Sequence, residues 1–271
     1  MHRVLCSTGA LIGKANNQDF TILNDCHGKI ACDGYEFLMY DRWYNSLEGI
    51  RSIVKRFPAP FPIFHVDKRI GERISRNHTG DIEKALSDFD CNCSLASAIG
   101  AEKLVIHLWG GLDSDRDMAN NIACYKDLRQ ISDSYGLILT VENVVCNHSD
   151  PLSHMLSLIH VFPDIQFTFD TKMAAFHNQL EQLFTDYYQI LFPHISHLHI
   201  NDYQGGFKDW MNLKTLHLGQ GHINFDAWFK QLRIANYYGD FTVEATSFDK
   251  NGDINFENLN ASLNRTRDYL W

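Results

Sequence analysis

The sequence predicts one α/β domain, spanning residues 1–271, that folds as a (β/α)8 TIM barrel. Apolar strand-like runs alternate with amphipathic helix-like segments along the chain, and no linker or run of Pro, Gly and Ser interrupts them. The length of 271 residues also suits this fold, which typically needs about 250 residues.

Each expected element follows from its own pattern. The apolar runs predict eight strands, at 3–8, 34–39, 62–66, 103–108, 137–142, 166–170, 195–200 and 240–245. Apolar residues at helical spacing predict helices at 19–29, 43–57, 81–99, 114–135, 152–161, 179–191, 225–237 and 256–270. In the last of these, Phe256, Leu259, Leu263 and Leu270 share one face, as expected for a helix packed on a barrel exterior.

Two connections are longer than the others. Residues 67–80 are basic and polar, and residues 203–224 contain a Gly205-Gly206 pair. We expect both to be loops, which at this length often act as lids or substrate walls.

Composition and charge exclude several classes of function. A net charge of −9 without a Lys/Arg cluster argues against a nucleic-acid partner, because such binding depends on cationic contacts to phosphates. Seven Cys without repeated Cys-x-x-Cys pairs argue against a disulfide framework. No apolar run approaches the ~18 residues of a membrane span. We therefore expect a cytoplasmic protein with a small polar substrate, and its homo-oligomeric state stays open.

Ionisable residues recur where the predicted strands end. The stretch Leu137–Asn143 is apolar until Glu142, and a charged residue at the end of a buried strand needs a partner or a task. The residues at the ends of the third to eighth strands are His65, His107, Glu142, Asp170, His199 and Glu244. Because the carboxyl ends of barrel strands meet at one mouth, the last four predict a metal site. A buried ion-pair network is the structural alternative.

Several motifs carry a resemblance that extends over nearly the whole chain. They are Val141-Glu142-Asn143, Phe169-Asp170-Thr171, His197-Leu198-His199-Ile200-Asn201-Asp202, Leu218-Gly219-Gln220-Gly221 and Val243-Glu244. In this order and spacing the chain resembles the xylose isomerase-like TIM barrel superfamily. That group contains sugar and sugar-phosphate isomerases and epimerases, inosose dehydratase and the endonuclease IV branch of DNA repair. The resemblance implies one divalent metal held by Glu142, Asp170, His199 and Glu244.

One position departs from the family pattern. The family usually continues Asp-Thr-x-His after the sixth strand, whereas Met173 stands in the place of that His. His177 is one helical turn further on and is a candidate substitute. Residues 212–216 also lack the Asp-x-His pair of the endonuclease branch, which argues against a trinuclear zinc site.

The expected chemistry is proton transfer at a carbon next to a carbonyl. Three carboxylates and one imidazole suit Mn²⁺ or Mg²⁺, with Co²⁺ or Zn²⁺ as alternatives. Such an ion acidifies the C–H bond of a bound ketose or polyol, and Glu142 and Glu244 would act as general base and acid through an enediolate.

Other residues are candidates for binding the substrate or for holding the metal ligands in place. The candidate substrate-binding residues are His65, His107, Trp109 and Lys208, and the candidate supporting residues are Asn143, His197 and Asp202. Core packing or surface solvation is the alternative for each substrate candidate.

The leading prediction is a metal-dependent sugar or sugar-phosphate isomerase or epimerase. The alternatives are an inosose dehydratase-type lyase, an abasic-DNA hydrolase like endonuclease IV, and a non-catalytic barrel that binds a carbohydrate.

Overall fold

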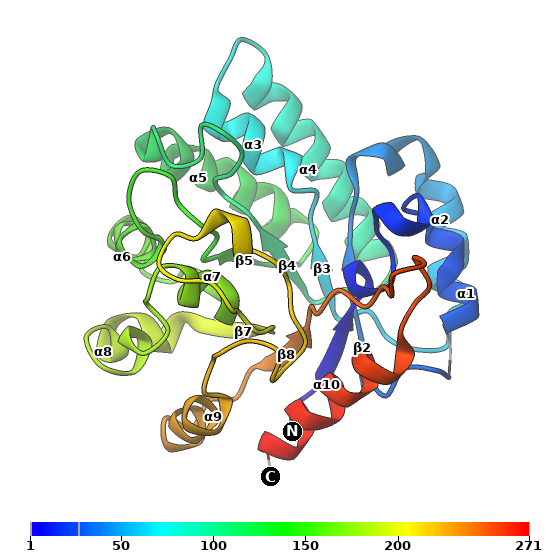
Figure 1. Ribbon diagram of the computed structural model, residues 1–271. Coiled ribbons are helices and arrows are strands. Elements are labelled where there is room, and N and C mark those ends of the chain that lie inside the picture. The colour runs from blue at the N-terminus through cyan, green and yellow to red at the C-terminus, as the bar shows by residue number, and fades with distance from the viewer. Residues whose placement is uncertain (1, 27, 271) are drawn as a thin grey trace. The chain divides into compact units, whose positions relative to one another are not determined.

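The eight parallel strands close into a barrel in which their order follows the chain, from β1 to β8 (Figure 1). The structure is a computed structural model that describes residues 2–26 and 28–270. The strands are β1 (Val4–Ser7), β2 (Gly34–Leu38), β3 (Ile63–His65), β4 (Lys103–Ile106), β5 (Ile138–Glu142), β6 (Gln166–Asp170), β7 (Ile195–Ile200) and β8 (Asp240–Val243). The predicted barrel and all eight predicted strands are confirmed.

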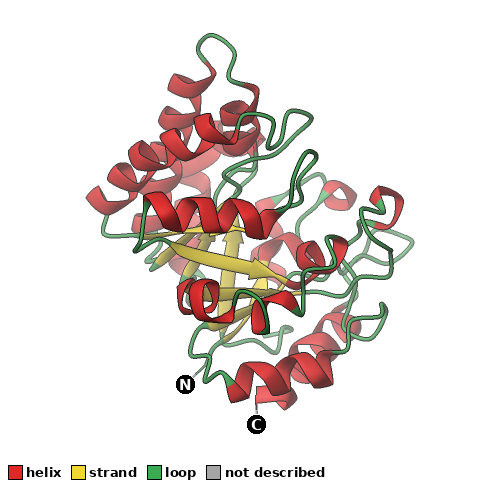
Figure 2. Ribbon diagram, turned by 90° about the vertical axis from the view of Figure 1, so that its left-hand side faces the viewer, coloured by secondary structure: helices red, strands yellow, loops and turns green. Residues whose placement is uncertain are grey.

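Helices alternate with these strands along the chain; Figure 2 distinguishes the helices, in red, from the strands, in yellow. The α-helices are α1 (Leu23–Cys26), α2 (Leu47–Arg56), α3 (Arg69–Arg76), α4 (Asp81–Ala98), α5 (Met118–Ser134), α6 (Pro151–Val161), α7 (Thr171–Phe176), α8 (Tyr188–Leu191), α9 (Phe225–Ile234) and α10 (Phe256–Leu270). The predicted domain 1–271 and the predicted helix 19–29 include residues 1, 27 and 271, which lie outside the described residues. Among the described residues, no helix has both the length and the apolar character that a membrane crossing requires.

The predicted loop at 67–80 is wrong, because most of it is helix α3. Ile70 and Ile74 are four residues apart and fully buried, so they form one face that packs on α4 and α5. The charged residues of the segment occupy the rest of the helix surface, which explains the polar appearance of the sequence. The loop expected at 203–224 is confirmed apart from a short 3-10 helix, Trp210–Asn212.

Several predicted helices are shorter than expected, including α2, which begins at Leu47, and α9, which ends at Ile234. The segment 19–29 contains the 3-10 helix Phe20–Ile22 and the single turn α1. The segment 179–191 contains only the 3-10 helix Gln182–Phe184 and α8, since the chain has already turned into α7 directly after β6. Helix α5 begins at Met118, where the Asp117 side chain accepts a hydrogen bond from the Asn120 N–H.

The chain groups into two compact units, each made of separate segments. Unit 1 comprises Met1–Glu36, Arg56–Pro60 and Phe169–Trp271, and unit 2 comprises Phe37–Lys55 and Phe61–Thr168. In unit 1, β1 pairs with β2 and β8, and β8 pairs with β7, with His199 opposite Thr242. Helix α10 packs against β1 and β8 through its buried Leu259 and Leu263, as its sequence pattern predicts.

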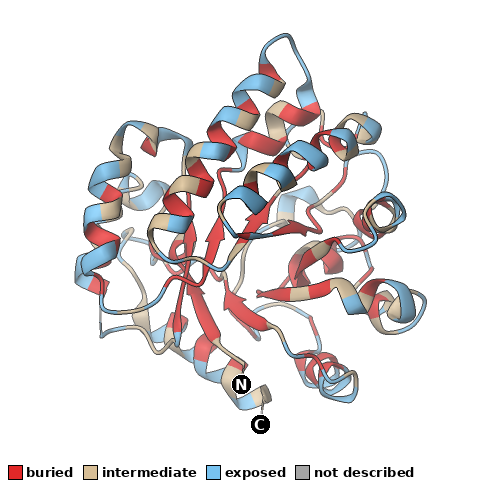
Figure 3. Ribbon diagram, turned by 180° about the vertical axis from the view of Figure 1, so that it is seen from behind, coloured by how far each residue is buried: buried red, intermediate tan, exposed pale blue. Residues whose placement is uncertain are grey.

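In unit 2, β3, β4, β5 and β6 pair in order. The strands are buried along most of their length (Figure 3). Thr140 of β5 and Thr168 of β6 face the same side of the sheet, because their hydroxyl oxygens lie 2.7 Å apart. Glu142 is two residues after Thr140 and therefore shares that side.

Candidate metal centre

Three of the four predicted metal ligands lie together in unit 1. Asp170 ends β6, His199 lies in β7 and Glu244 directly follows β8. Each offers one ligand atom, and these atoms lie within 4.8 Å of one another. Asp170 and His199 are fully buried, and the Glu244 side chain is 13% exposed. The strand ends thus form an oxygen-rich cluster with one imidazole, as the sequence predicts.

The Asp170 carboxylate is held in place by two hydrogen bonds. Oδ1 accepts from the backbone N–H of Met173 at 2.8 Å, which caps α7. Oδ2 accepts from the amide nitrogen of Asn201 at 3.0 Å. These hydrogen bonds orient the carboxylate at the end of β6. The sequence indicated no role for Asn201, although it lies two residues after His199 on the same side of the chain.

A buried carboxylate that the sequence analysis missed, Glu36 of β2, binds both histidines of β7. Its Oε2 lies 2.9 Å from Nε2 of His197 and 3.1 Å from Nε2 of His199, and its Oε1 is also 3.1 Å from Nε2 of His199. Burial alone would raise the pKa of Glu36, but the charges and hydrogen bonds of His199 and His197 hold it well below its usual value. Glu36 is therefore an ionised acceptor.

This contact fixes what the other nitrogen of His199 can do. The charge of His199 is present only while both ring nitrogens are protonated, and a histidine that binds a metal must be neutral. The neutral ring has one N–H and one lone pair, and the N–H belongs on Nε2 because Glu36 only accepts. Nδ1 then presents its lone pair 3.6 Å from Oε1 of Glu244. Two electron-pair donors facing each other in a buried site are satisfied by a cation between them, so the residues present fit a divalent metal.

The fourth predicted ligand, Glu142, lies with His65 and His107 in unit 2. Glu142 is 1% exposed, and its Oε2 lies 2.7 Å from Nε2 of His107 and 3.3 Å from Nε2 of His65. The contact between Oε2 of Glu142 and Nε2 of His107 is short, but its direction does not meet hydrogen-bond geometry. Nδ1 of His65 donates to the carbonyl oxygen of Val66 at 2.9 Å, and its Nε2 is at hydrogen-bond distance from Glu142.

His107 is a neutral base beside this carboxylate. Burial lowers the pKa of His107 to about 3, although Glu142 acts in the opposite direction. The ring is therefore neutral, and it lies beside the Glu142 carboxylate at the end of β5, within unit 2.

The two remaining substrate candidates lie in different environments. Trp109 is fully buried, donates its indole N–H to the Val144 carbonyl at 3.1 Å, and packs edge-on against His154. Lys208 is partly buried in the 203–224 loop, with its ammonium 5.9 Å from the centre of the Phe207 ring. A substrate role for either residue stays a prediction.

The predicted supporting residues are all buried. His197 contacts Glu36, and its Nε2 is also 3.1 Å from the Thr242 hydroxyl. The backbone N–H of Asn143 donates to the Thr168 carbonyl at 3.3 Å.

Asp202 organises the long loop that follows β7. Its Oδ1 accepts from the backbone N–H groups of Tyr203 and Ile223 at 2.8 and 3.1 Å. Its Oδ2 accepts from those of Gly219 and Gly221 at 2.8 and 2.9 Å. Both ends of the 203–224 loop are therefore tied to one side chain that lies three residues after His199.

A second carboxylate, Asp115, fixes the segment after β5 and was missed in the sequence. Its two oxygens accept from the backbone N–H groups of Asn147, His148 and Ser149 at 2.7–3.0 Å and from Nε2 of His154 at 2.9 Å. The bonded residues are more than 30 positions away in the chain, so no local pattern could reveal them.

The position that departs from the family pattern lies on α7. Met173 is partly buried there. His177, the candidate substitute, is 4% exposed and packs edge-on against Phe176, with ring centres 5.1 Å apart. A substrate role for His177 stays a prediction.

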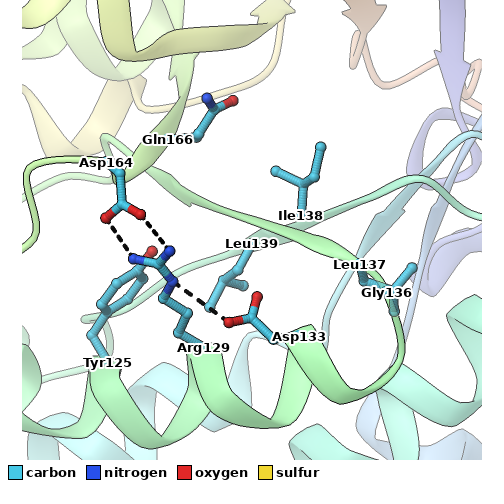
Figure 4. A pocket seen from close by; sticks show the side chains of 9 residues that line it. All are labelled: Tyr125, Arg129, Asp133, Gly136, Leu137, Ile138, Leu139, Asp164 and Gln166. Atoms are coloured by element: carbon cyan, nitrogen blue, oxygen red, sulfur yellow. Dashed lines mark hydrogen bonds and ion pairs between the residues drawn. The ribbon is translucent and has the colours of Figure 1, made fainter.

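A surface pocket of about 390 Å³ lies in unit 2 away from these residues. Its lining includes Ile138 and Gln166, which begin β5 and β6, so it is at the N-terminal ends of the strands (Figure 4). Arg129 within it is neutralised by Asp164, through contacts of 2.5 and 2.6 Å, and by Asp133 at 3.7 Å. This end of a barrel serves stability rather than catalysis.

Comparisons with known proteins agree with the fold. The profile described as xylose isomerase-like TIM barrel matches residues 34–268. A search of the curated proteins finds no match.

Similar solved structures include a D-tagatose 3-epimerase-like protein, 17% identical with a TM-score of 0.70, in which 99% of this chain and 97% of that chain are covered. The D-allulose 3-epimerase of Methylomonas sp., in complex with D-allulose, is 12% identical with a TM-score of 0.69, covering 99% and 97%. The IolI protein with a bound zinc atom is 12% identical with a TM-score of 0.68, covering 99% and 96%. At these identities the likeness shows the fold.

Proposed function

Because the chain belongs to the xylose isomerase-like TIM barrel family, we propose that it is a divalent-metal-dependent isomerase or epimerase of sugars or sugar phosphates. The observation that carries the proposal is the cluster of Asp170, His199 and Glu244, whose ligand atoms lie within 4.8 Å of one another. Asp170 and His199 are fully buried and Glu244 is partly buried, and a cation bound among them would offset the cost of burying their charges.

We propose Glu142 as the fourth ligand. It ends β5, and β6 with its terminal Asp170 is the next strand of the barrel. Three carboxylate groups and one imidazole favour Mn²⁺ or Mg²⁺, with Co²⁺ and Zn²⁺ as alternatives; one similar structure contains zinc. When bound, the ion supplies positive charge that stabilises the oxyanion of a ketose substrate.

The proton transfers fall to the two glutamates. Glu142 would accept the proton from the carbon next to the carbonyl. Glu244 would return a proton to the enediolate. Return to the opposite face of the same carbon is epimerisation, and return to the neighbouring carbon is isomerisation.

An anionic substrate group would need a cation that is not already paired with a carboxylate. Arg69 and Arg73, in α3, are engaged by carboxylates: Asp41 and Glu72 at 3.6 Å for Arg69, and Asp88 at 2.8 Å for Arg73.

Lys172, by contrast, is only 7% exposed, and no acidic side chain of residues 2–26 and 28–270 forms an ion pair with it. It lies two positions after Asp170, at the C-terminal end of β6. We therefore propose that Lys172, with Lys208 as the alternative, binds a phosphate or carboxylate of the substrate.

The test is exchange of substrate hydrogen with solvent. The Mn²⁺-loaded protein is incubated in D₂O with ketoses, their phosphates and inososes, and the products are followed by NMR. We expect deuterium at the carbon next to the carbonyl together with an epimer or isomer, and no exchange with Glu142→Gln. Glu257→Gln, an exposed charge-matched control, should behave as wild type.

Other outcomes would contradict the proposal. Loss of water from an inosose would assign a dehydratase-type lyase instead. Tight binding of a sugar without any exchange would assign a non-catalytic carbohydrate-binding barrel.

A further inference from the structure

We propose that Glu36 is a positioning residue that holds His199 in the tautomer able to bind a metal through Nδ1. The inference rests on the proposed function and gives it a residue that is not itself a ligand. Glu36 lies in β2, and its carboxylate is completely buried.

The contacts of Glu36 are directed to one nitrogen of His199. Oε2 lies at hydrogen-bond distance from Nε2, 3.1 Å away, and Oε1 is equally close to this nitrogen but lacks hydrogen-bond geometry. Nδ1, on the other side of the ring, lies 3.6 Å from Oε1 of Glu244 and belongs to the cluster that includes Asp170. The same ring thus connects an acceptor on one side with the proposed metal ligands on the other.

His197 helps to hold Glu36 in this position. Its Nε2 lies 2.9 Å from Oε2 of Glu36 and 3.1 Å from the Thr242 hydroxyl. Its ring centre is 5.1 Å from that of His199, with the two planes nearly perpendicular. Since all of these groups are fully buried, no water replaces a contact that is lost. This arrangement explains why two histidines alternate on β7 when only one belongs to the ligand cluster.

A carboxylate that binds the far nitrogen of a ligating histidine fixes its tautomer and increases its basicity, and loss of such a partner lowers metal affinity about 10- to 100-fold. Glutamine at position 36 keeps the shape of the side chain. It has a single acceptor oxygen and no charge, and its amide N–H₂ would face one of the two imidazole N–H groups. Glu36→Gln should therefore weaken metal binding with little change in packing.

Two measurements test the inference. The first is the tautomer of His199 in the metal-free wild-type protein, read from long-range ¹H–¹⁵N NMR correlations of its ring. We expect the Nε2–H form, and the Nδ1–H form would overturn the proposal. This measurement requires no variant and no activity.

The second measurement is calorimetric titration of Mn²⁺ into the metal-free protein. We expect Glu36→Gln to bind Mn²⁺ 10- to 100-fold more weakly than wild type, and the exposed control Glu257→Gln to match wild type. Equal affinities of Glu36→Gln and wild type would overturn the role of Glu36 and leave the proposed function standing. Failure of wild type to bind any divalent metal would instead count against the proposed function. If Glu36→Gln does not fold, the tautomer measurement decides.

Discussion

Asp115→Asn should lower the free energy of unfolding by about 3–6 kcal/mol at pH 7. The Asp115 carboxylate is 4% exposed and accepts four hydrogen bonds, three from backbone N–H groups and one from His154. Asparagine offers one acceptor oxygen, so about two of the four donors would face an amide N–H₂ instead. A hydrogen bond to a charged group contributes about 1.5–3 kcal/mol, and two losses give the expected magnitude.

The effect should depend on pH in a defined direction. Burial alone would raise the pKa of Asp115, but the hydrogen bonds from His154 and the backbone lower it well below its usual value. A pKa that is lower in the folded state than in the unfolded state gives stability that is complete above the unfolded pKa of about 3.9. It is lost as the pH falls through the folded pKa, by up to about 1.4 kcal/mol per pH unit.

The assay is denaturant unfolding of wild type and variant at pH 7 and pH 3, followed by circular dichroism. Asp133→Asn is the control, because its side chain is 63% exposed and its ion pair with Arg129 spans 3.7 Å; we expect a change of at most about 1 kcal/mol. Our reasoning fails if Asp115→Asn stays within about 1 kcal/mol of wild type at pH 7. It also fails if the difference does not shrink at pH 3.

Three further changes test other parts of the structure. Lys172→Met should raise the KM for a phosphorylated ketose about tenfold or more, since a charge-assisted hydrogen bond of about 1.5–3 kcal/mol is lost; steady-state kinetics showing the same effect on a neutral ketose would contradict this. Asp164→Ala should change the free energy of unfolding by at most about 1 kcal/mol, because its pair with Arg129 is largely exposed, and a larger loss in a urea titration would refute that view. Burial raises the pKa of the Cys26 thiol to about 11, so a disulfide reagent at pH 8 should modify Cys26 slowly until the protein is unfolded; rapid modification of the native protein would show that the thiol is accessible.

The strands could be predicted because their apolar runs are local signals. Leu137–Glu142 is a clear case, in which an apolar run ends at one charged residue and the structure has β5 over Ile138–Glu142. Helices with mixed composition were harder to predict. In α3, Ile70 and Ile74 form a two-residue apolar face that is too short to stand out among charged neighbours, and packing on α4 and α5 decides its conformation.

The strand-end residues of the candidate site could be predicted for the same reason, since they interrupt apolar runs. Glu36 also interrupts an apolar run, but no nearby residue indicates its partners, because His197 and His199 are more than 160 positions away. Asp115 looks like an ordinary loop residue until folding brings His154 to it. Polar contacts between distant segments depend on the tertiary fold, and local patterns do not contain them.

The measurement that tests the central claim most directly is the metal content of protein purified without chelators or metal-affinity resin, with Asp170→Ala beside wild type. Circular dichroism of the variant confirms that it is folded, because Asp170 also caps α7. We expect about one Mn, Mg, Co or Zn ion per chain in wild type and none in Asp170→Ala, as for a single four-ligand site. Absence of metal from both proteins, even after addition of Mn²⁺, would contradict the proposal and leave the cluster with a structural role.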